Sequence, residues 1–499
     1  TDTGYANDAW VNTTAMIWGK QSPVGGWQVA YTQFDKYGNN VWTDFTGISN
    51  QVYGRGFAAS GTTVVGTGLN RVDMETSAGI YNSYIVKYDG TGDLVDPGRA
   101  YAVSYDKGAG STGDPWGRAA WINPANGDVW TAGMGQGNLE RPAGTVAVTY
   151  TGAGDADQYI IKHNADGSAA IGFYDALSTG SEIPGGILSD ADGNIYVAGG
   201  TSGSLPGFTN AGAAGTYDMY IVKYNSAGVR QWVQQFGGTG NEFVYSMIWG
   251  NDGNIIITGD MSGDIDGTTN HDTTNPVATQ DGYIRVIDTD GTLVWNDQFG
   301  TDGDEGASGL SIDNDGNIWT GGWTEGSLVA TLGGTSDVYW RQYAPDGTVL
   351  KTLQISNPGD EQGVGAAVDG DPHRLYIGGG IVNGSWPGWA TPPGTHKYNS
   401  AEAMTLKVTA GDMNVDGMVD TTDIGLLHAA LVGAAPGTGD GTYDLTGDGS
   451  STGADGQYMI TDLFERKLGD IQSGVTGQTW DNDIDNADIG KAVGSFNGS

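Results

Sequence analysis

Oxygen-bearing side chains alternate along a twelve-residue stretch that begins at Asp412. The expected cation ligands are Asp412, Asn414, Asp416, the carbonyl oxygen of Met418, Asp420 and Asp423. The sixth residue, Gly417, permits the sharp turn that lets such a loop wrap around one ion. Hard oxygen ligands at alternating positions, with a carboxylate closing the loop, are the pattern that binds Ca²⁺ in proteins. The stretch therefore predicts a calcium site.

A second twelve-residue stretch, residues 444–455, repeats this spacing. Its expected ligands are Asp444, Thr446, Asp448, the carbonyl oxygen of Ser450, Thr452 and Asp455. It offers fewer carboxylates than the first stretch, so we expect it to bind Ca²⁺ more weakly. Val419 of the first stretch can form the small β-bridge that pairs two such loops, whereas Ser451 stands at the equivalent position. Pairing of the two loops is therefore left open.

A third stretch repeats only the second half of the pattern. Residues 484–490 copy residues 419–425, but an insertion separates them from the preceding acidic residue, Asp470. Two interpretations remain open. The stretch could form a third calcium site, or it could be a degenerate copy that is kept for packing. The ligands of such a site would be Asp470, Asp481, Asp485 and Asp488.

Residues 411–499 as a whole resemble a dockerin, in a form with a long insertion. The resemblance rests on the two EF-hand-type loops, on Asp423 rather than Glu at the twelfth position, and on the apolar helical face that follows at Ile424, Leu427 and Leu431. It implies a small α-helical module that Ca²⁺ folds, because clustered carboxylates repel one another until an ion neutralises them. It also implies a protein partner, either a cohesin or another copy of the same chain.

A repeated unit organises residues 1 to about 408. Its clearest part is a β-branched or aromatic run that closes with glycine, as in residues 194–199 and 254–259. The closing glycines are Gly19, Gly68, Gly133, Gly199, Gly259, Gly322 and Gly379. Successive glycines lie 49 to 66 residues apart, so the sequence predicts seven units.

Each unit contains four short β-type runs separated by Asp-Gly, Asn-Gly or Ala-Gly turns, in which residues such as Gly193 and Gly316 supply a positive φ. Long polar loops, such as residues 202–217 and 262–280, lengthen the units. Four strands repeated radially predict a mainly β fold, a seven-bladed β-propeller of four-stranded blades. A solenoid of stacked hairpins is the competing architecture.

The strings at residues 192–199 and 220–224 resemble the bacterial exported β-propeller repeat known as SBBP. The resemblance covers residues 1–408 and implies export and a propeller fold. It says almost nothing about activity, since one fold supports many functions.

Composition narrows the partners and the compartment. The 59 acidic residues outnumber the 21 basic ones, for a net charge of −38, which disfavours nucleic acid and anionic membrane surfaces. The chain has no cysteine, and it has no apolar run long enough to insert into a membrane. Because it begins at Thr1 without an initiator Met, we expect that a signal segment has been removed and that the protein is secreted to the cell surface or matrix.

The sequence has no catalytic signature, so we expect no catalytic residues and no cofactor other than Ca²⁺. The five histidines are scattered, and residues 311–319 match the sialidase Asp-box except for one extra residue before glycine. The favoured hypothesis is a non-enzymatic structural or adhesion protein that assembles with a partner or with identical subunits, as in a filament. The alternative is a propeller that binds or degrades a polysaccharide and is tethered to a cohesin-bearing scaffold. The sequence leaves a glycoside hydrolase or lyase open, because it gives no distances between carboxylates of different blades.

Overall fold

The chain divides into two compact units, Thr1–Lys407 and Val408–Ser499. The computed structural model describes residues 29–34, 40–46, 52–60, 63–70, 82–89, 98–107, 113–141, 145–152, 155–213, 215–265, 268, 270–271, 279–313, 315–355, 360–368, 374–382 and 401–409. Nearly all of these belong to the first unit. The first closing glycine, Gly19, and every predicted calcium ligand lie outside the described residues.

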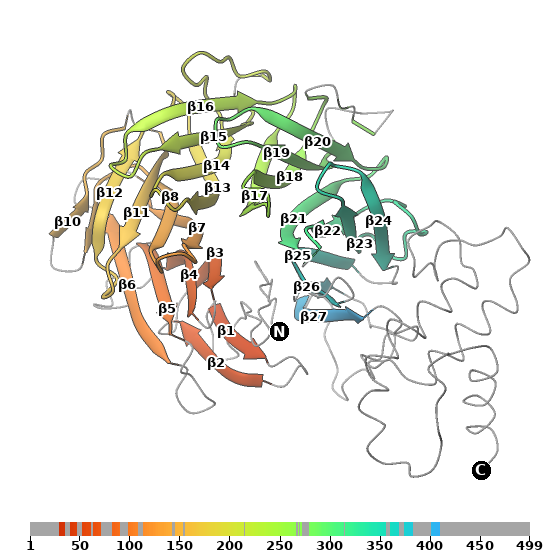
Figure 1. Cartoon of the computed structure of the whole chain (residues 1–499), viewed down its shortest axis with the longest axis horizontal. Coiled ribbons are helices and arrows are strands. Elements are labelled where there is room, and N and C mark those ends of the chain that lie inside the picture. The colour runs from red at the N-terminus through yellow and green to blue at the C-terminus, as the bar shows by residue number, and fades with distance from the viewer. Residues whose placement is uncertain are drawn as a thin grey trace, which may run out of the picture. The chain divides into compact units, whose positions relative to one another are not determined.

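The described residues form antiparallel β-strands grouped in sheets (Figure 1). The early strands are β1 (Val29–Phe34), β2 (Asn40–Thr46), β3 (Val52–Ser60), β4 (Thr63–Asn70), β5 (Asn82–Tyr88), β6 (Arg99–Lys107), β7 (Trp116–Ile122), β8 (Val129–Gly135), β9 (Leu139–Arg141), β10 (Thr145–Val148), β11 (Asp157–His163) and β12 (Ala169–Asp175). The middle strands are β13 (Glu182–Ser189), β14 (Ile195–Thr201), β15 (Asp218–Tyr224), β16 (Arg230–Phe236), β17 (Glu242–Trp249), β18 (Ile255–Met261), β19 (Asp281–Ile287) and β20 (Leu293–Phe299). The last are β21 (Glu305–Ile312), β22 (Ile318–Thr324), β23 (Asp337–Tyr343), β24 (Val349–Ile355), β25 (Asp360–Val368), β26 (Arg374–Val382) and β27 (Ala401–Thr409).

Four-stranded sheets are the repeating element, as the sequence predicts. Three successive sheets pair their strands in chain order: β13 to β16, β17 to β20, and β21 to β24. Figure 1 shows the first strand of each of these sheets toward the middle and the last strand at the outside. The first strands of neighbouring sheets contact one another, β7 with β13, β13 with β17, and β21 with β25. The described part of the first unit is thus mainly β, with the propeller arrangement and not that of a linear stack.

Two sheets depart from the simple four-strand order. The chain leaves β8 to form β9 and β10, which extend the sheet of β3 to β6 to six strands. It then returns to complete the sheet β12-β11-β8-β7. At the two ends, the described residues form a pair, β1 with β2, and a three-stranded sheet, β25-β26-β27.

A β-bulge interrupts the first strand of six sheets at the same place, in β3, β7, β13, β17, β21 and β25. The skipped residues are Arg55, Arg118, Gly185, Tyr245, Ser308 and Val364. The residue just before each bulge pairs with a glycine of the repeat, as Val244 pairs with Gly259. A Cβ on Gly259 would overlap the carbonyl oxygen of Phe243, so the bulge leaves no room for a side chain there. The repeating glycine therefore marks the bulge across from it.

The Asp-Gly-Asn turns adopt the predicted geometry. Gly193 and Gly316 have φ values of 79° and 86°, the left-handed region that glycine tolerates. The carboxylate of Asp313 accepts hydrogen bonds from the backbone N–H groups of Asp315 (3.0 Å) and Asn317 (2.8 Å). The Asp-box-like segment is therefore a hairpin turn held by its own aspartate.

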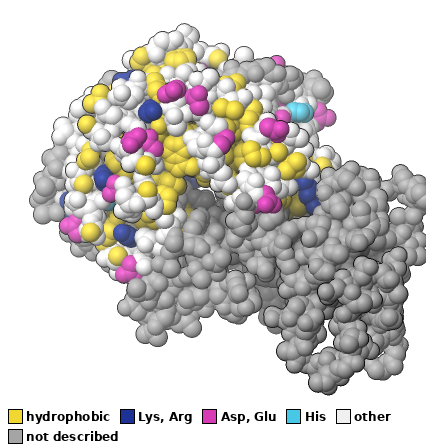
Figure 2. Space-filling view, viewed as in Figure 1, with side chains coloured by type: hydrophobic (Ala, Val, Ile, Leu, Met, Phe, Trp, Pro, Cys, Tyr) yellow, Lys and Arg dark blue, Asp and Glu magenta, His cyan; other side chains and the backbone are white. Residues whose placement is uncertain are grey.

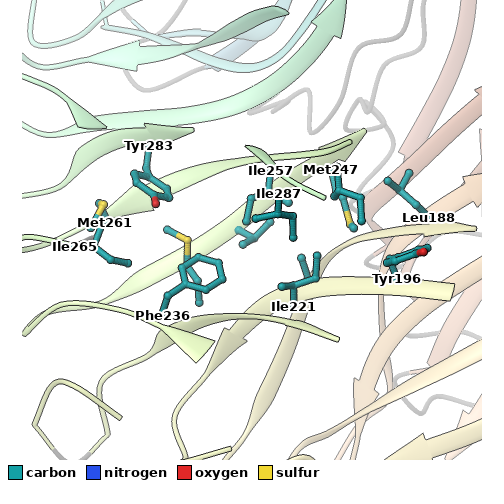
Figure 3. Close-up of a cluster of buried hydrophobic side chains, with 14 residues drawn as sticks. Leu188, Tyr196, Ile221, Phe236, Met247, Ile257, Met261, Ile265, Tyr283 and Ile287 are labelled. Carbon is teal, nitrogen blue, oxygen red and sulfur yellow. The ribbon is translucent and has the colours of Figure 1, made fainter. Parts of the chain in front are cut away.

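The hydrophobic core lies between neighbouring sheets. One cluster joins Leu188 and Tyr196 of one sheet to Met247 and Ile257 of the next (Figure 3). The tyrosine at the third position of the repeated third strand, such as Tyr220, is fully buried in all five sheets where its side chain is described. These tyrosines are therefore core residues and not sugar-binding platforms. Burial between sheets fixes how far apart successive first strands lie.

Candidate functional site in a cavity between the first strands

The predicted metal ligands and the described strands belong to different parts of the chain. All sixteen residues expected to bind Ca²⁺, from Asp412 to Asp488, fall outside the described ranges, so the structure brings none of them together. Within the described ranges, no group of three or more His, Asp or Glu residues is arranged to hold a metal ion. Among the same residues, no helix has the length and apolar character that crossing a bilayer requires.

A cavity of about 360 Å³ lies against the bulged first strands. Residues of β3, β7, β13, β17 and β21 line it, together with side chains from the second strands β18 and β22. Five skipped residues of the bulges are among them: Arg55, Arg118, Gly185, Tyr245 and Ser308. Because a bulge re-aims the extra residue, the repeated fold brings the skipped residues of five sheets to a shared space, and all of them except Gly185 carry a side chain.

Two arginines lie side by side in this cavity. Strands β3 and β7 approach so closely behind the bulges that a Cβ on Gly56 would lie 2.6 Å from the Cα of Ala119. Arg55 and Arg118 directly precede these two residues and both line the cavity. Burial and the positive charge of Arg55 together lower the pKa of Arg118 to about 10. The cavity thus concentrates positive charge in a chain whose net charge is −38.

A tyrosine–aspartate pair lies in another part of the lining. The hydroxyl of Tyr245 donates a hydrogen bond of 2.8 Å to Oδ2 of Asp260. Asp260 is buried, and its other oxygen, Oδ1, has no hydrogen-bond partner. Burial raises the pKa of Asp260 to about 7, against the opposing effect of the Tyr245 hydrogen bond. Burial also raises the pKa of Tyr245. Tyr245 is 41% exposed as a whole residue, whereas Asp260 is 3% exposed. The raised pKa of each group favours its neutral form.

Buried glutamates begin three of the first strands but serve a different purpose. Glu305 accepts hydrogen bonds from the backbone N–H and the hydroxyl of Thr301, each at 2.7 Å. Burial raises the pKa of Glu182 and Glu305 to about 7 and that of Glu242 to about 8. None of the three lines the cavity described above. Glu182 and Glu305 tie the turn that precedes their strand to the sheet through hydrogen bonds with Ser178 and Thr301.

No sequence motif identifies the residues that line the cavity. Arg55 and Arg118 stand in unlike sequence surroundings, and no short motif contains both. A signal is nonetheless present in the repeat. Five closing glycines (Gly68, Gly133, Gly199, Gly259 and Gly322) lie opposite the residue before a bulge, and the next residue on the partner strand lines the cavity.

Comparison with known proteins yields one partial relative among the curated proteins. The chain is 26% identical over 262 residues to the regulatory protein FlaEY of Caulobacter vibrioides, an alignment that covers 45% of this chain. It spans about a quarter, 27%, of the length of that relative.

Solved structures give distant similarities only. An ulvan lyase of a polysaccharide lyase family matches with a TM-score of 0.45 and 10% identity, over 82% of this chain and 94% of that one. A puromycin hydrolase mutant also matches with a TM-score of 0.45, at 12% identity, over 81% of this chain and 53% of that one. The β-propeller domain of a protease from Pyrococcus furiosus gives 0.34 at 13% identity, over 72% and 90% of the two chains.

The family comparison concerns the C-terminal unit. Residues 410–463 match the model of the dockerin type I domain. The match includes both complete twelve-residue loops and ends before the third, partial one. Residues 410–463 therefore form a dockerin type I domain, which follows the β-sheet repeats in the sequence.

Proposed function

We propose that this protein is an extracellular, non-enzymatic assembly component whose C-terminal module docks onto a protein partner in the presence of Ca²⁺. The dockerin type I match at residues 410–463 carries the proposal. Dockerin loops bind their ion through regularly spaced oxygens, and both loops of this chain retain that spacing. The partner is a cohesin-type domain or a second copy of the chain, and the latter would produce a filament.

The proposed calcium ligands follow from the loop positions. The first site uses Asp412, Asn414, Asp416, Met418, Asp420 and Asp423, and the second uses Asp444, Thr446, Asp448, Ser450, Thr452 and Asp455. The third site, with Asp470, Asp481, Asp485 and Asp488, lies beyond the residues that match the dockerin model.

The proposed domain division has a seven-bladed propeller at residues 1–408 and the docking module at residues 411–499. Seven closing glycines in the sequence and the repeated four-stranded sheets support the blade count. The division into compact units at Lys407 and Val408 agrees with this boundary. The SBBP-type strings support export of the propeller.

Size-exclusion chromatography of the full chain with a panel of cohesin domains tests the docking proposal. We expect a complex, or self-assembly without any added partner, at millimolar Ca²⁺ and none after chelation. Electron microscopy then separates filaments of identical subunits from discrete complexes. A chain that stays monomeric and binds none of the cohesins at any Ca²⁺ concentration would contradict the proposal.

A second candidate function is glycan binding by the propeller, and one observation favours it. The cavity brings together polar side chains with Tyr245 and Trp323, the residue types with which proteins contact sugar rings. In this version the docking module tethers a saccharide-binding propeller to a scaffold. Glycan-array binding by the full chain, compared with the Y245A and W323A variants, tests it. Equal binding by all three proteins, or no binding at all, would remove this candidate.

A further inference from the structure

We propose that the cavity binds an oxyanion group, a carboxylate or a sulfate, between Arg55 and Arg118. The choice of an acidic saccharide as the ligand rests on the second candidate function, glycan binding by the propeller. The oxyanion site itself can exist without that function, and the experiment below separates the two.

The position of the arginines is the first observation. Both occupy the skipped position of a bulge, on the neighbouring strands β3 and β7, and both line the same cavity. A guanidinium presents planar N–H donors that match two oxygens of a carboxylate or sulfate. Two of them in one cavity form a receptor for a single anionic group.

The charge balance of the cavity is the second observation. Among the described residues, Arg118 forms no salt bridge. Of the charged side chains near it, Arg55 has the largest effect on its pKa. Asp260 is the carboxylate of the lining, but its hydrogen bond goes to Tyr245 and not to an arginine. Arg118 is partly buried and feels the positive charge of Arg55, so an incoming anion would offset the cost of burying the Arg118 guanidinium.

The contrast with the rest of the chain is the third observation. Acidic side chains are spread in small separate groups over the face shown in Figure 2, with fewer Lys and Arg between them. With 59 acidic residues against 21 basic ones, the chain repels free anions in general. Selective retention of an anion therefore requires a local cluster of positive charge, and the bulges of β3 and β7 supply one.

The polar groups around the arginines suit a sugar acid better than a bare ion. Ser308 and Gln280 line the same cavity and can exchange hydrogen bonds with hydroxyls, and Trp323 offers an aromatic face. A volume of about 360 Å³ accommodates one or two sugar rings. An anionic monosaccharide or the end of an acidic glycan fits these features.

Isothermal titration of the full chain at low ionic strength tests the inference with three probes: glucuronate, glucose and inorganic sulfate. We expect glucuronate and sulfate to bind and glucose to bind at least about tenfold more weakly, because it lacks the charge. The R118M and R55M variants should lose about tenfold or more in affinity for both anions, and R118K should retain part of it. Binding should also weaken as salt is raised.

The matched control is R230M, since Arg230 pairs with Asp175 at 3.1 Å away from the cavity. It should bind both anions as the unmodified chain does. Thermal unfolding of R118M shows whether a loss of binding reflects a loss of folding. Unchanged anion affinity in both R118M and R55M, or no binding of either anion by the unmodified chain, would overturn the inference. Sulfate binding without glucuronate binding would uphold the oxyanion site and reject the saccharide function.

Discussion

At the scale of single residues, burial sets the chemistry of the described carboxylates. Asp260 and Glu242 are both fully or almost fully buried, and burial is the largest cause of the raised pKa of each. Their hydrogen-bond surroundings differ, because Asp260 has the hydroxyl of Tyr245 as its donor whereas Glu242 faces the backbone N–H groups of Gly238 and Gly240. We therefore expect substitutions that affect Asp260 and Glu242 to change stability in different ways.

Replacing Tyr245 by Phe should destabilise the chain by about 1–3 kcal/mol, because the buried Asp260 loses its hydrogen-bond donor while its other oxygen is already unpartnered. The pKa of Asp260 should rise further, since that hydrogen bond favours the charged form. Thermal unfolding at pH 6 and pH 8 measures both effects, and the loss should be larger at pH 8. An equal loss at the two pH values would mean that Asp260 does not titrate in this range.

Replacing Glu242 by Gln should reduce the dependence of stability on pH. The folded pKa of Glu242, about 8, lies above its ordinary value of 4.5, so the folded state binds the proton more tightly than the unfolded state does. Its contribution to the free energy of unfolding is complete below pH 4.5 and is lost as the pH rises toward about 8. The amide mimics the protonated acid, so E242Q should be more stable than the unmodified chain above pH 8, by about 1–3 kcal/mol.

Chemical denaturation at a series of pH values measures this difference. The matched control is D290N, which removes one negative charge from an exposed residue. If D290N and E242Q reduce the pH dependence of the free energy of unfolding equally, the cause is the change in net charge and not the buried carboxyl group.

At the scale of elements, the bulge and the glycine opposite it form one structural device. The carbonyl of Phe243 occupies the place of a Cβ on Gly259, and the bulge that follows holds Tyr245 at the cavity. The same pairing recurs in the sheets that begin with β3, β7, β13, β21 and β25. Backbone geometry therefore requires the glycine, while the bulged residue differs from one sheet to the next. The repeat thus separates the residues that build the fold from those that line the cavity.

Replacing Gly259 by Ala should cost at least about 2 kcal/mol more than replacing Gly253 by Ala. Gly253 lies in a turn with φ of 81° and open space around it, so its substitution costs only the left-handed strain of about 1–2 kcal/mol. At Gly259 the new methyl group overlaps a backbone carbonyl, and the paired strands must move apart. Urea unfolding of the two variants measures the difference. Equal costs would show that the bulge rearranges easily to accept the methyl group, and that the position of Tyr245 is not fixed by it.

At the scale of the whole molecule, the two compact units should respond differently to Ca²⁺. Removing the ion should leave the proposed ligands of residues 412–423 and 444–455 as uncompensated neighbouring carboxylates, which destabilises the C-terminal unit. All the proposed ligands lie in the second unit, so we expect the stability of the described sheets of the first unit to stay the same.

Hydrogen exchange followed by mass spectrometry, with and without chelator, measures this response region by region. We expect faster exchange on chelation in residues 410–463 and unchanged exchange in strands such as β14 and β18. The D412N/D423N double variant should exchange like the chelated protein even at millimolar Ca²⁺. Protection of residues 410–463 that survives chelation would contradict a calcium-folded module.

The sequence alone determined those features whose signals are local. The oxygens of a calcium loop lie within twelve residues, and residues 410–463 proved to match a dockerin type I domain, although the individual ligands and the third site stay predictions. Tight turns such as Asp192-Gly193-Asn194, and the four-stranded units between them, could likewise be predicted, because strand alternation and positive φ are properties of short segments.

Only the tertiary structure decided which side chains share a space. Arg55, Arg118 and Tyr245 are separated by 63 and 127 residues (118 − 55 and 245 − 118), and they meet because sheet-to-sheet packing sets the spacing of the first strands. The pKa values of Asp260 and Glu242 depend in the same way on what covers them. Distances and burial across sheets come from packing of the whole unit, and no local pattern in the chain encodes them.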